Sequence, residues 1–237
     1  MKIRRLMRLL LAIAGLAVPP VLAKAQALVD SPDSSGTIAS TPSAQPDLTY
    51  ARPTEKTKIQ NYLFDAFGPY PAVGAVFAAG IGQAYETPPE WKQGVEGFSK
   101  RFGSAFAIAA ISTSTRYGIA EALREDTLYY RCECKSVFPR LRHALISTLT
   151  ARRGLDGHSV FSFPALIAPY AGSMTAVYAW YPGRYNGKDA FRMGNYTVLG
   201  YVGGNIALEF FYSGPHSMLH RMHFNNGHGA PNPGSNP

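Results

Sequence analysis

The chain has 237 residues and a formal net charge of +8, a basicity that taken alone is typical of nucleic-acid-binding proteins. Five of the basic residues lie within the first 25 residues, which contain no acidic residue, so the remainder holds 18 basic and 15 acidic residues. Most of the excess charge is therefore confined to the amino terminus, and no nucleic-acid partner is expected. With only two cysteines the fold has no disulfide framework, so packing must stabilise it.

Residues 1–25 have the three parts of a secretory signal peptide. A basic start is followed by a short apolar stretch at 9–18, and small residues at Ala23 and Ala25 stand where a signal peptidase cleaves. The apolar stretch is shorter than the roughly 20 residues that span a bilayer, which argues against a permanent anchor. We therefore predict cleavage after Ala25 and a mature chain that is exported to the periplasm or cell envelope.

The mature chain divides into three parts by composition. Residues 26–53 are rich in Ser, Pro, Thr and Asp, which bury too little apolar surface to offset the entropy of ordering, so a disordered linker is expected. From residue 54 onward, helical spacing of apolar residues prevails, and sustained alternation is absent. The pattern predicts an all-α domain over 54–224, a single compact bundle of about six helices rich in small residues, followed by a disordered tail at 225–237.

The first expected helix covers residues 54–67, with Thr54 as its N-cap and Gly68 just beyond its end. The second covers 72–84 and repeats small residues every four positions. These residues are Gly74, Ala78 and Gly82, and also Ala75 and Ala79. Such a spacing leaves a flat strip along the helix that a second helix can approach closely.

A third helix is expected to open at the two prolines Pro88 and Pro89 and to extend as far as Leu123. Its large residues Trp91, Val95, Phe98 and Phe102 have the spacing of one buried face. Further helices are expected over residues 139–152, 163–180 and 189–211. Within the last of them, Glu209 lies in an apolar stretch, where a carboxylate needs a partner such as Arg116 or Arg192.

Two long uncharged stretches, 66–85 and 157–183, raise the alternative of a polytopic membrane protein. Both are rich in Gly, Ser, Pro and Tyr and lack the dense Leu, Ile and Val of lipid-facing helices. The composition therefore favours a close-packed helical domain, with an envelope membrane or protein as the expected partner.

The segment 121–134 concentrates the polar side chains that could carry chemistry. A carboxylate shielded from water there could act as a general acid or base, and the candidate catalytic residues are Glu125, Asp126, Tyr130 and Arg131. The favoured alternative is a solvated charge cluster at a helix end, in which Arg124 pairs with Glu121 or Asp126. No motif for a bound cofactor accompanies the cluster, and none is expected.

Cys132 and Cys134 are separated by one residue, and in an oxidising compartment we expect them to form a local disulfide across a turn. The alternative is a reduced pair that binds a metal ion together with His143, although a structural site normally has a second pair of ligands. Near the carboxyl terminus, four more histidines could also bind a metal, but a frayed segment is expected there. These are His216, His220, His223 and His228.

Four phrases of the sequence occur together: Pro-Glu-Trp-Lys-Gln-Gly at 89–94, Gly-Phe-Ser-Lys-Arg-Phe-Gly at 97–103, Glu-Asp-Thr-Leu-Tyr-Tyr-Arg at 125–131 and an arginine-rich stretch at 140–156. In this the chain resembles a group of uncharacterised exported proteins of soil bacteria, especially acidobacterial ones. In that group the third phrase often reads Glu-Asp-Pro-Arg-Tyr-Phe, so Thr127 and Leu128 stand here in place of proline and arginine. The resemblance covers about residues 55–212 and implies export and a helical domain, with no assigned activity.

Two hypotheses for the function follow. The first is an exported envelope protein that is not an enzyme and that packs or interacts through its small-residue helix faces. The second is a periplasmic or membrane-associated hydrolase or lipid-modifying enzyme that uses Glu125, Asp126, Tyr130 and Arg131. They differ in whether the polar cluster lines a concave pocket.

Overall fold

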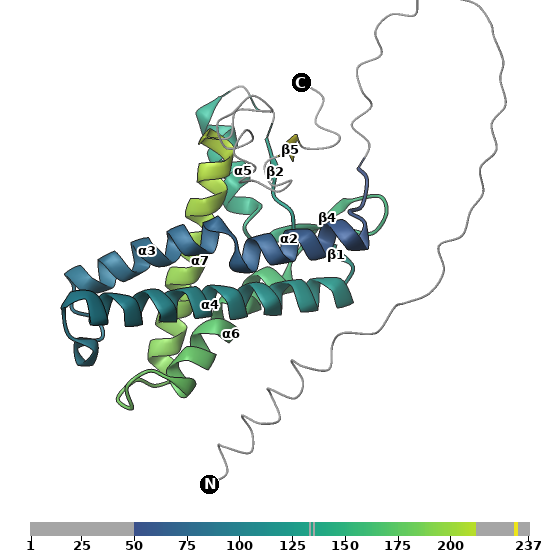
Figure 1. Ribbon diagram of the computed structural model, residues 1–237. Coiled ribbons are helices and arrows are strands. Elements are labelled where there is room, and N and C mark those ends of the chain that lie inside the picture. Colours follow the sequence, from purple (N-terminus) through teal and green to yellow (C-terminus); the bar gives the residue numbers. More distant parts are fainter. Residues whose placement is uncertain (1–49, 133, 135, 212–229, 232–237) are drawn as a thin grey trace, which may run out of the picture. The chain divides into compact units, whose positions relative to one another are not determined.

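A computed structural model describes residues 50–132, 134, 136–211 and 230–231 (Figure 1). The predicted signal peptide, most of the predicted linker and the four carboxyl-terminal histidines lie outside these residues. The helices are α2 (Glu55–Phe67), α3 (Pro69–Ala84), α4 (Gly94–Ala122), α5 (Val137–Ile146), α6 (Phe163–Ala179) and α7 (Gly187–Phe211), with a short 3₁₀ helix η1 (Pro89–Trp91). The strands are β1 (Glu125–Asp126), β2 (Tyr130–Arg131), β3 (Thr150–Arg153), β4 (His158–Phe161) and β5 (Ala230–Pro231).

The fold is mostly helical, as predicted, but it is not all-α and is not a simple six-helix bundle. Strands β1, β3 and β4 form a small antiparallel sheet, and β2 pairs in parallel with β5. The predicted tail is therefore engaged at residues 230–231. At the other end, the ordered domain already includes Tyr50, four residues before the predicted start.

The small sheet replaces the end of the helix expected over 139–152. Helix α5 ends at Ile146, and the hydroxyl of Thr150 donates a hydrogen bond back to the Ile146 carbonyl. Strands β3 and β4 are joined by a turn in which Gly154 and Gly157 have φ of +78° and +66°. Glycine adopts such angles without strain, and four-residue strands are too short for alternation to be detected.

The predicted bounds of α2 are correct, whereas α3 begins earlier than predicted and ends where expected. The Thr54 hydroxyl accepts a hydrogen bond from the Thr57 amide at 3.3 Å, and α2 ends at Phe67. Helix α3 begins at Pro69, three residues before the expected start at residue 72, so Pro69 and Pro71 lie in its first turn. Proline is tolerated there because the first amides of a helix have no intrahelical acceptor.

The predicted buried face of α4 is wrong. The 3₁₀ helix η1 ends at Trp91, and Lys92, with a φ of +57°, separates it from α4. The side chain of Val95 is 85% exposed. The buried positions of α4 are Gly97, Arg101, Ser104, Ile108, Ser112 and Ala120. Small and polar residues thus form the inner face, because they allow the neighbouring helices to approach closely.

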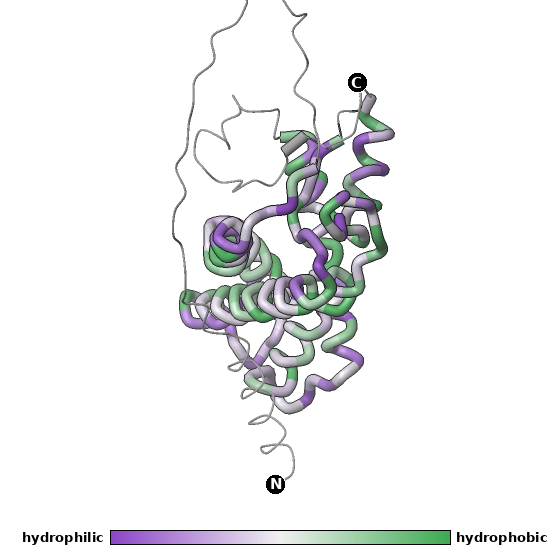
Figure 2. The backbone as a smooth tube through the Cα atoms, turned by 90° about the vertical axis from the view of Figure 1, so that its right-hand side faces the viewer, coloured by the Kyte–Doolittle hydropathy of each residue, from purple (hydrophilic) through white to green (hydrophobic). Residues whose placement is uncertain are grey.

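Helix α4 is central to the packing. Helices α2 and α3 follow one another along it, α6 packs on α4, and α7 packs on α6 and α5 (Figure 1). The core between them consists largely of alanine, including Ala75, Ala79, Ala168 and Ala176. Many larger apolar side chains are exposed, and Figure 2 shows hydrophobic stretches along the helices. Within the described residues, no helix combines the length and the apolar character needed to cross a membrane.

Candidate functional site

An apolar groove of about 810 Å³ lies between α3, α4 and α7. It arises because α3 packs on α4 whereas α7 packs on α6, so the facing sides of α3 and α7 stay apart. Its middle section is lined by Ala105, Ile108 and Ala109 of α4. A volume of this size lies within the range of about 300–1,000 Å³ that is usual for ligand pockets.

The small-residue strip predicted on α3 forms one side of this groove. Gly74, Ala75, Ala78 and Gly82 line it, and of the strip residues Ala75 and Ala79 are buried. The predicted close approach of a second helix describes Ala75, Ala79 and Gly82, since a Cβ atom added at Gly82 would lie 3.1 Å from the Arg101 side chain of α4. A Cβ atom added at Gly74 would meet no other atom within 4 Å, so the space beside it is open.

Helix α7 presents a matching set of glycines on the opposite side. Gly200, Gly203 and Gly204 line the groove, and a Cβ atom added at any of them would also meet nothing within 4 Å. Bulky side chains stand beside these open positions. Phe77 of α3 and Tyr196 of α7 line the groove and are 69% and 64% exposed. The groove thus combines open backbone surface with unpacked aromatic side chains.

One end of the groove contains Arg101, which is only 4% exposed. Its guanidinium group donates hydrogen bonds to the backbone carbonyls of Thr87, Pro88 and Lys92 and to the side-chain carbonyl of Gln83, at 2.7–2.9 Å. These acceptors are all neutral. Arg101 therefore ties the loop between α3 and α4 together and brings a positive charge to the groove lining.

A second polar group lies where α2 and α4 meet the groove. The Tyr117 hydroxyl donates a hydrogen bond to Asp65 at 2.5 Å, and burial together with the Asp65 carboxylate raises the pKa of Tyr117 far above 10. Arg116 also lines the groove, and its guanidinium carbon lies 5.9 Å from the ring centre of Tyr201. Its hydrogen bond to the Thr127 carbonyl is long, at 3.4 Å.

The four predicted catalytic residues do not line this groove. Glu125 of β1 is buried, where it accepts hydrogen bonds from Arg153 at 2.6 Å and from the Ser162 hydroxyl at 2.7 Å. These partners join β1, β3 and the start of α6. Arg131 lies in β2, in register with Pro231 of β5. Glu125 thus lies in the β1–β3 pairing and Arg131 in the β2–β5 pairing.

Asp126 is likewise engaged. It accepts hydrogen bonds from the hydroxyls of Tyr50 at 3.0 Å and Tyr130 at 2.7 Å, and Arg152 lies over both rings. Burial and the nearby Asp126 carboxylate raise the pKa of each tyrosine well above 10. Tyr130 is therefore protonated at neutral pH. Through Asp126 and Arg152, Tyr50 at the start of the described domain is attached to strands β1 and β3.

The expected pairing of Arg124 with Glu121 or Asp126 is wrong. Glu121 pairs instead with Lys58 of α2, at 2.7 Å. Apart from Tyr130, the side-chain partners of Glu121, Glu125 and Asp126 come from distant parts of the chain, so inspection of the segment 121–134 could not identify them.

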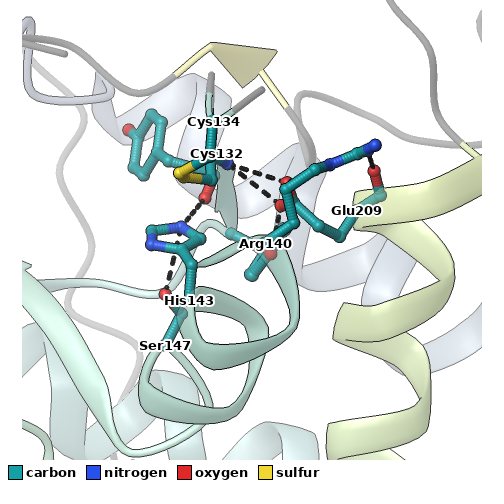
Figure 3. A network of polar contacts seen from close by, with 8 residues as sticks. Cys132, Cys134, Arg140, His143, Ser147 and Glu209 are labelled. Atoms are coloured by element: carbon teal, nitrogen blue, oxygen red, sulfur yellow. Dashed lines mark hydrogen bonds and ion pairs between the residues drawn. A yellow bond between two sulfur atoms is a disulfide. The ribbon is translucent and has the colours of Figure 1, made fainter. Parts of the chain in front are cut away.

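Glu209 of α7 is fully buried and is the centre of a polar network (Figure 3). Its carboxylate accepts hydrogen bonds from the Tyr129 hydroxyl at 2.6 Å, the Cys132 amide at 3.0 Å and the Arg140 Nε at 3.1 Å. The expectation of an arginine partner was right, but the partner is Arg140 and not Arg116 or Arg192. Arg140 belongs to α5, which packs against α7.

In the same network the sulfurs of Cys132 and Cys134 form a disulfide, and the two Cα atoms are 5.1 Å apart (Figure 3). His143 Nε2 lies 2.8 Å from the Tyr130 carbonyl and 3.3 Å from the Ser147 hydroxyl. Because a carbonyl only accepts, Nε2 must carry the proton, so His143 is not placed to take one from Ser147. Among the described residues, no three His, Cys, Asp or Glu side chains gather in a way that could hold a metal ion.

That the two cysteines are bridged in the exported protein stays a prediction, and thiol titration tests it. In denatured, unreduced mature protein we expect no free thiol, and after reduction two per chain, because an oxidising compartment does not preserve a close thiol pair. Two free thiols before reduction would contradict the disulfide, and metal bound in equal stoichiometry would favour the alternative with His143.

Sequence and structure comparisons add no relative from which a role for the groove could be taken. The chain matches no protein-family model, no curated protein and no solved structure, so a role for the groove must follow from its own residues.

Proposed function

We propose that this is an exported, non-enzymatic protein of the cell envelope whose helical domain holds an apolar or amphipathic guest in the groove between α3, α4 and α7. The signal-peptide pattern of residues 1–25 supports export. The groove supports guest binding because it is large, mostly apolar and open to the small-residue faces of α3 and α7.

The observation that carries the proposal is the set of open glycines. Gly200, Gly203 and Gly204 lie in the interior of α7, where each glycine costs roughly 1 kcal/mol of helix stability relative to alanine. Among the described residues, no atom lies within 4 Å of a Cβ atom added at any of them. A guest that lies directly on the helix backbone explains these glycines, because a side chain at any of the three positions would fill the space that the guest occupies.

The alternative of a hydrolase or lipid-modifying enzyme has less support. It requires Glu125 or Asp126 to face a concave site, whereas both carboxylates accept hydrogen bonds from neighbouring side chains and neither lines the groove. Tyr130, the other proton-transfer candidate, has a raised pKa that opposes ionisation near neutral pH.

Groove filling tests the proposal directly. We expect Gly74→Leu to weaken binding of a neutral fluorescent dye such as Nile red by at least about tenfold, because the leucine side chain would occupy the guest's space. The measurement is a fluorescence titration of the purified mature protein.

The matched control is Gly80→Leu on the same helix. Gly80 also has nothing within 4 Å of an added Cβ atom but does not line the groove, so both variants gain the same helix propensity. Dye binding by Gly80→Leu should equal that of the wild type. If the two variants bind dye equally, the guest does not occupy the groove and the proposal fails.

A further inference from the structure

We propose that the guest is a single-chain anionic amphiphile, a long-chain carboxylate, whose head group binds Arg116 and whose chain follows the glycine-lined part of the groove. This inference rests on the proposed function and adds the chemical class of the ligand. It is carried by the charge and by the shape of the groove lining.

The size and lining of the groove suit one flexible chain. Groove residues of α7 run from Met193 to Leu208, which at 1.5 Å per residue is about 22 Å of helix. On the opposite side, Gly74, Ala78 and Gly82 cover about 12 Å of α3. A space bordered by glycine and alanine leaves room for a flexible methylene chain, and a volume of about 810 Å³ is that of one small ligand.

The charge of the lining favours an anion. Two arginines, Arg101 and Arg116, line the groove together with one carboxylate, Asp65. The hydrogen bonds of Arg101 are made to neutral acceptors, and Asp65 accepts one from Tyr117. The lining therefore has one positive charge in excess, which a guest with a single negative charge would balance.

Arg116 is the group placed to bind the head of the guest. Its one hydrogen bond to a described residue, the Thr127 carbonyl, is 3.4 Å long, and its other described contact is the Tyr201 ring. A guanidinium group has five N–H donors in a planar fork that matches a carboxylate in bidentate geometry. Arg116 therefore retains donors for a carboxylate, whereas Arg101 already uses four of its five N–H donors in its own hydrogen bonds.

A helix from a second copy or from another envelope protein fits less well. A helix with its side chains is about 10–12 Å across, and an apolar helix seated in the groove would cover Arg116 without supplying a negative charge. Covering a charge without a partner opposes binding. A chain with an anionic head avoids this penalty, because its carboxylate replaces the water around the guanidinium group.

The test compares three amphiphiles with the same sixteen-carbon chain on the purified mature protein, below their micelle concentrations. These are hexadecanoate, hexadecanol and hexadecyltrimethylammonium, each measured by displacement of Nile red. We expect hexadecanoate to bind at least about tenfold more tightly than hexadecanol and the ammonium compound to bind most weakly. Arg116→Gln should reduce hexadecanoate affinity to that of hexadecanol and leave hexadecanol binding unchanged.

The matched control is Arg192→Gln. Arg192 lies on α7, pairs with Asp189 and does not line the groove, so its replacement should alter none of the three affinities. Equal affinities for the three compounds, or an unchanged preference in Arg116→Gln, would overturn the anionic head group while the groove remained a binding site. Binding that is insensitive to Gly74→Leu would overturn the proposed function itself.

Two further outcomes would identify another occupant and overturn the inference. If dye binding disappears as the protein dimerises with rising concentration in size-exclusion chromatography, the occupant is a second copy. If the protein binds vesicles of anionic phospholipid but does not bind free hexadecanoate, the negatively charged group that Arg116 binds belongs to a lipid in a membrane surface.

Discussion

Glu209→Ala is expected to destabilise the domain by about 3–5 kcal/mol, the usual cost of removing one partner of a buried ion pair. The carboxylate is fully buried and is the acceptor for Tyr129 and Cys132, on either side of β2, and for Arg140 of α5. Without it, the part-buried Cys132 amide and the buried Tyr129 hydroxyl lose an acceptor, and Arg140 loses its counter-charge. The measurement is the free energy of unfolding in urea, followed by circular dichroism.

The control for this variant is Glu96→Ala. Glu96 also pairs with a cation, Lys100 of the next helical turn, but its side chain is 77% exposed, so solvent compensates for its loss. Its replacement should leave the urea midpoint unchanged. A Glu209→Ala variant as stable as the Glu96→Ala variant would show that the network around Glu209 contributes nothing to stability.

Gly172→Ala is expected to destabilise the protein by about 1–3 kcal/mol, even though alanine favours a helix more than glycine does. Gly172 lies in α6 where it crosses α4, and an added Cβ atom would clash with the Ser112 hydroxyl and lie 2.6 Å from the Ile108 carbonyl. Since the second contact is with backbone, a rotamer change cannot relieve it, and the two helices must move apart.

Gly118→Ala provides the comparison, because Gly118 lies in α4 and an added Cβ atom there would meet nothing within 4 Å. This variant should be stabilised by up to about 1 kcal/mol, so the two substitutions should have opposite signs. Thermal unfolding of both variants measures this difference. A stabilised Gly172→Ala variant would contradict the close α4–α6 packing.

The sequence by itself determined the helical character of the domain and several helix boundaries. The Thr54 cap, the end of α2 before Gly68 and the extent of α6 are recognisable because capping and helix formation depend on residues within about four positions of each other. The small-residue strip at Gly74, Ala78 and Gly82 was recognisable for the same reason. Its spacing is a property of one helix.

Only the tertiary structure decided what these local features are used for. Whether the strip at Gly74 is packed or open depends on where α7 lies, more than 100 residues further along the chain. The pairing of Glu209 with Arg140 spans 69 residues and follows from the contact between α5 and α7. Long-range pairs of this kind depend on how helices pack, and the spacing of residues within one segment does not specify that packing. For the same reason the groove and its arginines became visible as a site only in the folded chain.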